Sequence, residues 1–287
     1  MGVTPPGGTD DPEVCRIGER QVAYETVGDP TGRPVLFCHG TPGSRLLVRL
    51  LEGPAAERGL RLVAPDRPGI GASDPSDGGI EAWTDDVRAL FSHLGIDSAE
   101  VLGFSGGAPY ALACHRLPAV DHVTLVGGVG PPAVGDVGRT QRVLGYLART
   151  TPWLLGPLLR LQRLVLARRD PSAALDLLAA RPPDPRRLTD AEVARLVKAD
   201  LLAATAQGTA TLVEAFATLG RPWPFALGDV EVPVTVVQGR RDGNVPPETG
   251  PALVEHLPDA THRPVDADHL GSLLASVQYL HASPTHV

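Results

Sequence analysis

One short stretch constrains the fold more than any other. Residues 103–107, with the sequence GFSGG, fit the pattern Gly-x-Ser-x-Gly. An apolar, strand-like run precedes this stretch at residues 100–104, and a helical run follows it at residues 108–115. Between a strand and a helix, this pattern forms a nucleophile elbow, a tight turn that exposes the serine hydroxyl at the end of the strand. The glycines suit such a turn because the serine backbone is strained and any bulk beside it would collide. We therefore predict that Ser105 is a nucleophile.

The chain around this turn alternates between strand-like and helical segments. A chain of 287 residues is long enough for one large α/β domain. Apolar runs such as residues 34–38 are typical of strands that helices bury on both faces. Strands are predicted at residues 21–27 (an edge strand), 34–38, 61–64, 100–104, 120–126, 232–238 and 261–265, and helices at 83–94, 108–115, 248–256 and 270–280. The alternation indicates an α/β fold.

The alternation stops between residues 131 and 227. This segment is rich in Leu, Ala and Arg and has helical periodicity that prolines interrupt. It predicts an insertion of four or five short helices that forms a cap over the active site. The core domain would then consist of residues 13–130 and 228–287. Residues 1–12 have the Pro- and Gly-rich composition of a disordered tail.

The predicted cap is unusually basic and contains a leucine-rich run. Between residues 131 and 190 the chain has ten arginines and five aspartates. These arginines could simply lie on solvated helix faces, or they could steer an anionic substrate toward the site. Candidates for an apolar substrate pocket are Phe104, Trp153, Leu154 and Leu158. Leucine-rich groups of this kind, which here also include Leu155 and Leu159, more often form core between cap helices.

Two further residues complete a catalytic arrangement with Ser105. A serine needs a base to take its proton, and the base needs an orienting carboxylate. In enzymes with an elbow the chain order is Ser, then Asp or Glu, then His. Asp242 follows one predicted strand and His269 lies in the loop after the next. Asp266 and Asp268 are too close in sequence to His269 to face its ring easily, and we interpret them as loop-capping residues.

The other histidines have less suitable positions. His93, His115, His122 and His256 fall on helices or helix ends, His262 lies near the last strand, and His281 and His286 lie in the tail. His39 belongs to the loop at residues 39–44, which follows a predicted strand, and we interpret it as a structural brace. We assign the amides of Thr41 and Gly106 to an oxyanion hole. Asp66 and Arg67 are predicted to form a local ion pair.

These motifs resemble the α/β-hydrolase fold superfamily. The resemblance rests on the loop at residues 39–44, the loop DRPGIGAS at residues 66–73, the elbow, residues 239–242 and the pair Asp268-His269. More narrowly, the chain is similar to bacterial capped serine hydrolases with an HGxPG oxyanion loop. The resemblance implies a mainly parallel eight-stranded sheet with helices on both faces. It does not imply a substrate, because the scaffold also carries thioesterases, lactonases, C–C bond hydrolases, lyases and small-molecule receptors.

The expected function is that of a serine hydrolase. It would cleave a carboxylic ester, thioester or lactone of a small apolar substrate through an acyl-enzyme. A biosynthetic lyase, cyclase or C–C bond-cleaving enzyme on the same fold is the alternative, and a ligand-binding receptor ranks below it. Peptidase activity also ranks below ester hydrolysis. Epoxide hydrolases and haloalkane dehalogenases of the superfamily use aspartate at the elbow, where this chain has Ser105.

Composition excludes several other classes. The net charge of −7 argues against a nucleic-acid partner. No apolar run approaches the ~18 residues that a membrane span needs, so we expect no membrane partner. Three cysteines without a CxxC pair predict small core residues rather than disulfides, and no Cys/His cluster suggests a metal or other cofactor. The absence of a signal-peptide pattern predicts a cytoplasmic protein. The use of arginine in place of lysine, with Lys198 the single lysine, suggests a bacterial source.

Overall fold

The computed structural model describes residues 11–134, 138–177 and 190–281. The predicted disordered tail lies outside these residues except for its last two positions. Parts of the predicted cap, residues 135–137 and 178–189, also lie outside them.

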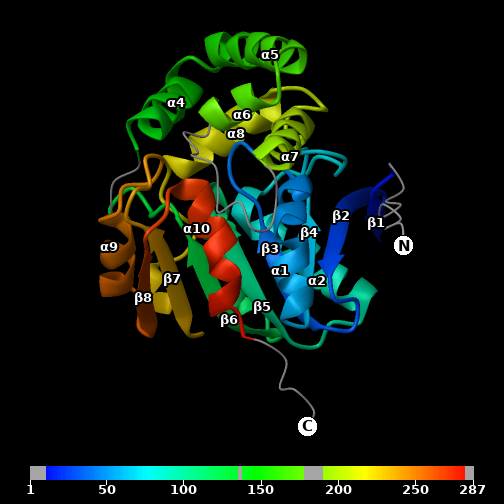
Figure 1. The fold of residues 1–287 in the computed structure, drawn as a ribbon, viewed down its shortest axis with the longest axis vertical. Helices are drawn as coiled ribbons and strands as arrows, with labels where there is room; N and C mark the ends of the chain where they lie inside the picture. Colours follow the sequence, from blue (N-terminus) through cyan, green and yellow to red (C-terminus); the bar gives the residue numbers. More distant parts are fainter. Residues whose placement is uncertain (1–10, 135–137, 178–189, 282–287) are drawn as a thin grey trace.

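The centre of the molecule is an eight-stranded sheet (Figure 1). Its strands lie in the order β1-β2-β4-β3-β5-β6-β7-β8. Strand β2 pairs antiparallel with both β1 and β4, and all pairs from β4 to β8 are parallel. The strands are β1 (Glu13–Ile17), β2 (Arg20–Gly28), β3 (Arg33–Cys38), β4 (Leu60–Pro65), β5 (Ala99–Phe104), β6 (Val120–Val126), β7 (Val234–Gly239) and β8 (Ala260–Val265). The predicted mainly parallel, eight-stranded α/β fold is confirmed.

The sequence-based assignment of the edge strand of the sheet was wrong. Strand β2 is not at the edge, because β1 pairs with it along its outer side. Strand β1 is short, and Cys15 is its one buried side chain. Its pattern of exposed and half-buried residues gives little apolar signal, which is why the sequence did not predict it.

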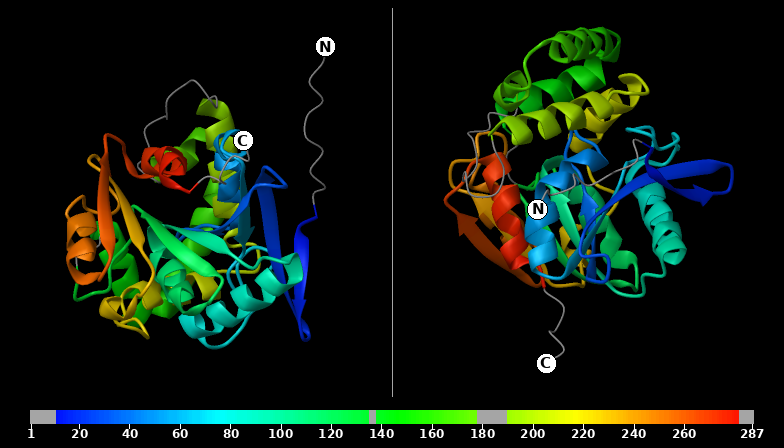
Figure 2. Two further views of the ribbon diagram at one scale, coloured as in Figure 1. Left: turned by 90° about the horizontal axis from the view of Figure 1, so that it is seen from below. Right: turned by 45° about the vertical axis from the view of Figure 1, so that its right-hand side comes forward.

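Helices cover both faces of the sheet and divide the core into two clusters. Helices α2 (Gly79–Leu94), α3 (Ala108–Ala113) and α9 (Thr249–His256) supply buried residues to one cluster. Helices α1 (Glu52–Glu57) and α10 (His269–Ser276) supply the cluster on the other face. The left view of Figure 2 shows α10 and α2 on opposite sides of the sheet. The central strand β5 is buried along its whole length, as its apolar run predicts.

Between β6 and β7, the described residues form five helices. They are α4 (Arg139–Thr150), α5 (Pro152–Arg168), α6 (Ser172–Leu177), α7 (Asp190–Ala203) and α8 (Ala210–Leu219). Figure 1 shows them gathered at one end of the sheet, with α4 and α5 outermost. Helices α4, α5 and α8 share a small apolar core of their own, which includes Leu155, Leu159 and Phe216.

The structure tests two expectations from composition, which concern the cysteines and membrane-spanning segments. Cys15, Cys38 and Cys114 are free and buried, as predicted for small core residues. In the part of the chain that the structure describes, no helix combines the length and the apolar character needed to cross a membrane.

Candidate active site

Ser105 lies at the turn between β5 and α3, in a strained conformation. Its φ is 53°, and it is the one non-glycine residue with positive φ among those described. Crowding explains the flanking glycines. A Cβ on Gly103 would lie 2.5 Å from the Cβ of Ala111, and a Cβ on Gly107 would lie 2.1 Å from the carbonyl oxygen of Cys38. The turn therefore requires glycine on both sides, and it holds the serine at the carboxyl end of β5.

Asp242 and His269 form a buried hydrogen-bonded pair at the same edge of the sheet. Asp242 follows β7 and His269 is the first residue of α10, after β8. The imidazole Nδ1 lies 2.7 Å from Oδ2 of Asp242. The other carboxylate oxygen, Oδ1, accepts hydrogen bonds from the amides of Asn244 and Val245, each 2.9 Å long. Because a carboxylate accepts hydrogen bonds, Nδ1 of His269 donates and Nε2 is left as the basic nitrogen.

Gly127 leaves the space in which these side chains meet. It follows β6, the strand between β5 and β7, and its φ is 50°. A Cβ at this position would lie 2.9 Å from both Oδ2 of Asp242 and Nδ1 of His269. The sequence showed a strand closed by two glycines but gave no sign of this contact, which depends on residues more than a hundred positions away.

Ser105 and His269 are neighbours across the strand ends without a direct hydrogen bond. The ring of Phe104, next to Ser105, lies 4.7 Å from the imidazole of His269, measured between centroids. Among the described residues, no hydrogen bond joins the Ser105 hydroxyl to the imidazole. Such bonds are often long in the absence of substrate and shorten when it binds.

The two amides assigned to the oxyanion hole lie beside each other. Thr41 belongs to the loop after β3, and Gly106 follows Ser105. A Cβ on Gly106 would lie 3.1 Å from the amide nitrogen of Thr41. Within the described part of the chain, the Thr41 amide donates no hydrogen bond. It could therefore donate to a substrate oxygen at this position.

Arg67 braces both sides of the predicted oxyanion hole. Its buried guanidinium donates to the carbonyls of Gly40 and Gly106 and to Oγ1 of Thr41. The guanidinium also lies over the ring of Tyr110, 4.5 Å from its centroid. Positive charge is thereby held next to the loop whose amide would donate to a substrate oxyanion.

The predicted ion pair between Asp66 and Arg67 is wrong. Asp66 instead pairs with Arg45, at 2.6 Å between Oδ2 and the guanidinium. Neighbouring residues that continue a strand direct their side chains to opposite sides, so Asp66 and Arg67 contact different parts of the structure.

His39 is a structural residue, as interpreted from the sequence. It is fully buried, and its Nε2 accepts a hydrogen bond from the amide of Arg67 at 3.3 Å. Its Nδ1 therefore carries the proton and donates to the carbonyl of Gly40 at 3.0 Å. Burial, with the nearby charge of Arg67, holds the pKa of His39 well below its usual value, so the ring is neutral. Its role is to fix the shape of the loop.

Asp200 connects the inserted helices to the same loop. It lies on α7, and its Oδ1 accepts hydrogen bonds from both the amide and the hydroxyl of Ser44, each 2.7 Å long. Burial raises the pKa of Asp200 to about 7. No local pattern predicts this contact, because one aspartate in a helical run carries no motif.

Three of the predicted pocket residues are exposed. The exposed fractions are 74% for Trp153, 51% for Leu154 and 50% for Leu158, all on α5. Side chains that enclose a substrate are expected to be shielded from solvent, so their expected place in a pocket is not supported. Helix α5 instead turns Leu155 and Leu159 inward, toward α8. Phe104 is buried and contacts His269.

One apolar cavity lies away from Ser105, Asp242 and His269. Its volume is about 410 Å³, and it lies where the chain leaves the sheet after β6 and where it returns before β7. Its lining includes Val134, Trp223 and Phe225. Neither Ser105 nor His269 contributes to it.

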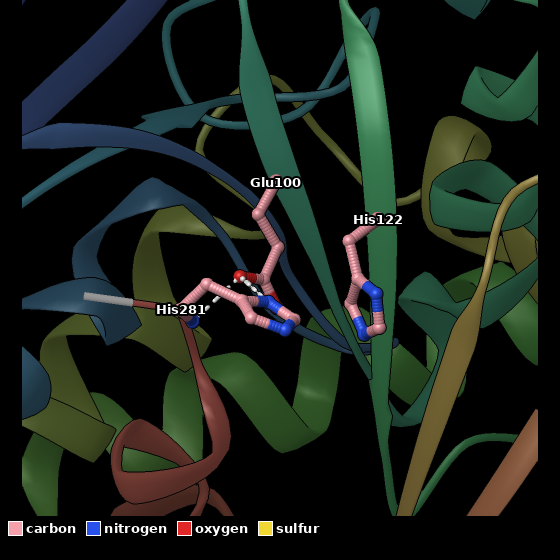
Figure 3. A group of neighbouring side chains, drawn as sticks. All are labelled: Glu100, His122 and His281. Carbon is pink, nitrogen blue, oxygen red and sulfur yellow. Dashed lines mark hydrogen bonds and ion pairs between the residues drawn. The ribbon is translucent and has the colours of Figure 1, made fainter. Parts of the chain in front are cut away.

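A cluster of side chains with metal-binding chemistry lies elsewhere on the sheet (Figure 3). Candidate ligand atoms of Glu100, His122 and His281 lie within 4.8 Å of one another. Each residue already has protein partners. Glu100 accepts from Oγ1 of Thr124 and from both the amide and the Nδ1 of His281, and His122 is bonded to Thr235. These bonds anchor the chain after α10 to β5, which accounts for the cluster without a metal.

Comparisons with known proteins identify the family of the chain. Residues 33–276 match the family described as "alpha/beta hydrolase fold". The chain belongs to this family. A proline iminopeptidase of Xanthomonas citri is 33% identical over 122 residues, which are 40% of this chain and 38% of that protein. The chain thus spans less than half the length of the curated relatives that it matches.

Solved structures of the family share the fold over nearly the whole chain. The enol-lactonase from Burkholderia xenovorans superposes with a TM-score of 0.64 at 17% identity, covering 93% of this chain and 96% of the lactonase. An esterase from Exiguobacterium antarcticum gives a TM-score of 0.65 at 18% identity, covering 92% and 98% of the two chains. At this level of identity the likeness shows the fold alone.

Proposed function

We propose that this protein is a serine hydrolase that cleaves a carboxylic ester, thioester or lactone through Ser105, His269 and Asp242. One observation carries the proposal. A serine held at positive φ at the end of β5 shares a sheet edge with a buried Asp–His pair whose free nitrogen is basic. This is the arrangement that turns a weak serine nucleophile into a strong one. The family supports hydrolysis, and the ester class is inferred from the serine.

The reaction follows from the positions of these groups. Nε2 of His269 takes the proton of Ser105 as the serine oxygen attacks the acyl carbonyl. The amides of Thr41 and Gly106 donate to the oxyanion, and each such donor typically contributes about 3 kcal/mol to the transition state. His269 then protonates the leaving alcohol or thiol. Water, deprotonated by the same nitrogen, attacks the acyl-enzyme and releases the acid, while Asp242 holds the imidazole tautomer throughout.

The inserted helices have a proposed role as a cap. The core would comprise residues 13–130 and 228–287, and the cap residues 131–227, as predicted. Support comes from the hydrogen bonds of Asp200 on α7 to Ser44, the last residue of the predicted oxyanion loop. A cap in this position would exclude water and select an apolar acyl group.

The proposal is tested by steady-state kinetics with p-nitrophenyl esters from acetate to long acyl chains. We expect turnover by the wild type, and a fall in kcat of about a thousandfold or more in Ser105→Ala. Ser92→Ala, which removes an exposed hydroxyl on α2, is the matched control and should keep full activity. Proline p-nitroanilide belongs in the panel because one relative is a proline iminopeptidase.

Two results would contradict the proposal. A folded wild type that turns over no ester, thioester or lactone would favour a lyase, cyclase or C–C bond-cleaving enzyme on the same fold. Faster cleavage of the anilide than of every ester would favour a peptidase.

A further inference from the structure

Exposed apolar side chains are concentrated on two of the inserted helices. Among the described residues, all the large hydrophobic side chains that are exposed lie on α4 and α5. They are Val143, Tyr146, Trp153, Leu154, Leu158, Leu161, Leu164 and Val165, with exposed fractions from 46% to 74%. A soluble surface rarely gathers so many large apolar groups in one place unless they have a partner.

Helix α5 is apolar on both of its faces. Leu155, Leu159 and Leu166 point inward and are buried. Leu154, Leu158, Leu161 and Val165 follow one another at spacings of four, three and four, so they form a continuous stripe on the opposite, exposed face. A helix that is hydrophobic all round is normally covered on every side, yet α5 is the outermost helix of the molecule (Figure 1).

The charge on these two helices is of one sign. From residue 139 to residue 169 the chain has seven arginines and no aspartate or glutamate, although its net charge is −7. Arg142, Arg149, Arg160, Arg168 and Arg169 are exposed. A second copy of the chain is a poor partner, because a two-fold contact through α4 and α5 would bring arginines against arginines, and neither helix carries an acidic residue.

We propose that the exposed face of α5, with its flanking arginines, docks on an anionic phospholipid surface. Leucine and tryptophan on the contacting face, with arginine beside them, are the composition of helices that lie in the plane of a membrane interface. The apolar stripe would enter the boundary between headgroups and acyl chains, and the guanidinium groups would pair with lipid phosphates. The inference concerns binding alone and does not rest on the proposed hydrolysis.

This inference revises an expectation drawn from the sequence. No membrane partner was expected because no segment is long enough to span a bilayer, and none of the described helices could do so. A helix that lies on the surface needs no such length. The same geometry explains why Trp153, Leu154 and Leu158 point away from the protein.

Tryptophan fluorescence gives a direct test. Trp83 and Trp223 are 0% and 8% exposed, so Trp153, at 74%, is the tryptophan whose emission should respond to lipid. We expect a blue shift on adding mixed vesicles of phosphatidylcholine and phosphatidylglycerol, and much less with phosphatidylcholine alone. Trp153→Phe should abolish the shift. Added salt should weaken binding.

Variants of the exposed face separate the apolar from the charged contribution. In vesicle co-sedimentation, Leu161→Glu with Leu164→Glu should lower binding about tenfold or more. Arg160→Glu should lower it about fivefold or more. Arg16→Glu makes the same charge change at an exposed position on β1 and should bind like the wild type. Thermal unfolding checks that each variant is folded. If the double variant does not fold, vesicle binding by Arg160→Glu and the emission of Trp153 still test the proposal.

Three results would overturn the proposal. The first is no binding to vesicles that contain phosphatidylglycerol. The second is an equal loss of binding in Arg16→Glu and Arg160→Glu. This result would show that the vesicles attract the protein through its overall charge and not through the exposed face of α5. The third is a dimer in solution with Trp153 already shielded before lipid is added, which would identify a second copy as the partner.

Discussion

At the scale of single residues, glycines mark where the proposed active site has no room for a side chain. Gly103 is crowded by the first turns of α3, Gly107 by the backbone at the end of β3, and Gly127 by the side chains of Asp242 and His269. Gly127 differs from the others because the atoms that it would meet are Oδ2 of Asp242 and Nδ1 of His269. A side chain at this position would therefore disturb the hydrogen bond with which Asp242 orients the imidazole of His269.

Gly127→Ala should therefore impair catalysis more than stability. The added methyl would push apart two groups that lie 2.7 Å from each other, and displacements of about 1 Å in an active site cost about a hundredfold in rate. We expect kcat with p-nitrophenyl esters to fall by about that factor. Gly18→Ala is the matched control: its φ of 62° imposes a similar backbone strain, but nothing lies within 4 Å of the new methyl. Equal activity of the two variants would contradict this role of Gly127.

At the scale of secondary-structure elements, α7 and the loop after β3 are joined through one buried carboxyl group. Asp200 accepts two hydrogen bonds from Ser44, and it lies close enough to Asp66 for the two charges to repel. Burial is the main cause that raises the pKa of Asp200 to about 7, far above the value near 4 of an unfolded chain. The contact between α7 and this loop should therefore depend on pH.

The sign of the dependence follows from proton binding. Between pH of about 4 and about 7, the folded protein keeps a proton on Asp200 that the unfolded chain releases. This group therefore stabilises the fold less as the pH rises through that window. Asp200→Asn keeps the accepting oxygen but does not titrate. Its free energy of unfolding, relative to the wild type, should rise by up to about 1.4 kcal/mol per pH unit in the window.

Urea unfolding of both proteins at several pH values measures this difference. Asp85→Asn, on the exposed face of α2, serves as the control and should show no such trend. A difference between Asp200→Asn and the wild type that does not vary with pH would contradict a raised pKa at Asp200.

Most elements could be predicted from the sequence, because local patterns determine them. The apolar runs at residues 34–38 in β3 and 101–104 in β5 identify strands that are buried on both faces. Periodicity also predicted helices between residues 131 and 227, but without the bounds of α5. It could not show which apolar face of α5 points inward, because both faces carry leucines. Trp153, Leu154 and Leu158 were therefore expected at a pocket, although they lie on the exposed face.

At the scale of the whole molecule, two groups of polar side chains lie at opposite ends of the parallel strands. The proposed catalytic residues follow the carboxyl ends of β5, β7 and β8. The cluster of Glu100, His122 and His281 lies near the amino ends of β5 and β6. Its hydrogen bonds attach the chain after α10 to the sheet, so we expect it to contribute to stability rather than to chemistry.

His281→Ala should lower stability and leave catalysis unchanged. It removes one side-chain hydrogen bond to the buried carboxylate of Glu100, while the amide of His281 keeps the other. We expect the free energy of unfolding to fall by about 1 kcal/mol, with kcat/KM for esters unaltered. Chemical unfolding and ester kinetics on one preparation provide both values. A loss of activity at constant stability would contradict the separation of the two ends.

The proposed catalytic residues and their order could be predicted from the sequence. The residues that hold the site in shape could not. Ser105, Asp242 and His269 each follow a strand, and the ends of parallel strands meet at one edge of a sheet. Arg67, Gly127 and Asp200 act through contacts with distant segments, which no local pattern reports. The exposed face of α5 was missed for a related reason, since its partner lies outside the chain.

The most direct test of the catalytic proposal is the site of a covalent adduct. A p-nitrophenyl alkylphosphonate reacts with an activated serine, and mass spectrometry identifies the modified residue. We expect one adduct per chain, on Ser105, forming far more slowly in Asp242→Asn and not at all in Ser105→Ala. An unmodified wild type, or an adduct on any other residue, would contradict Ser105 as the nucleophile.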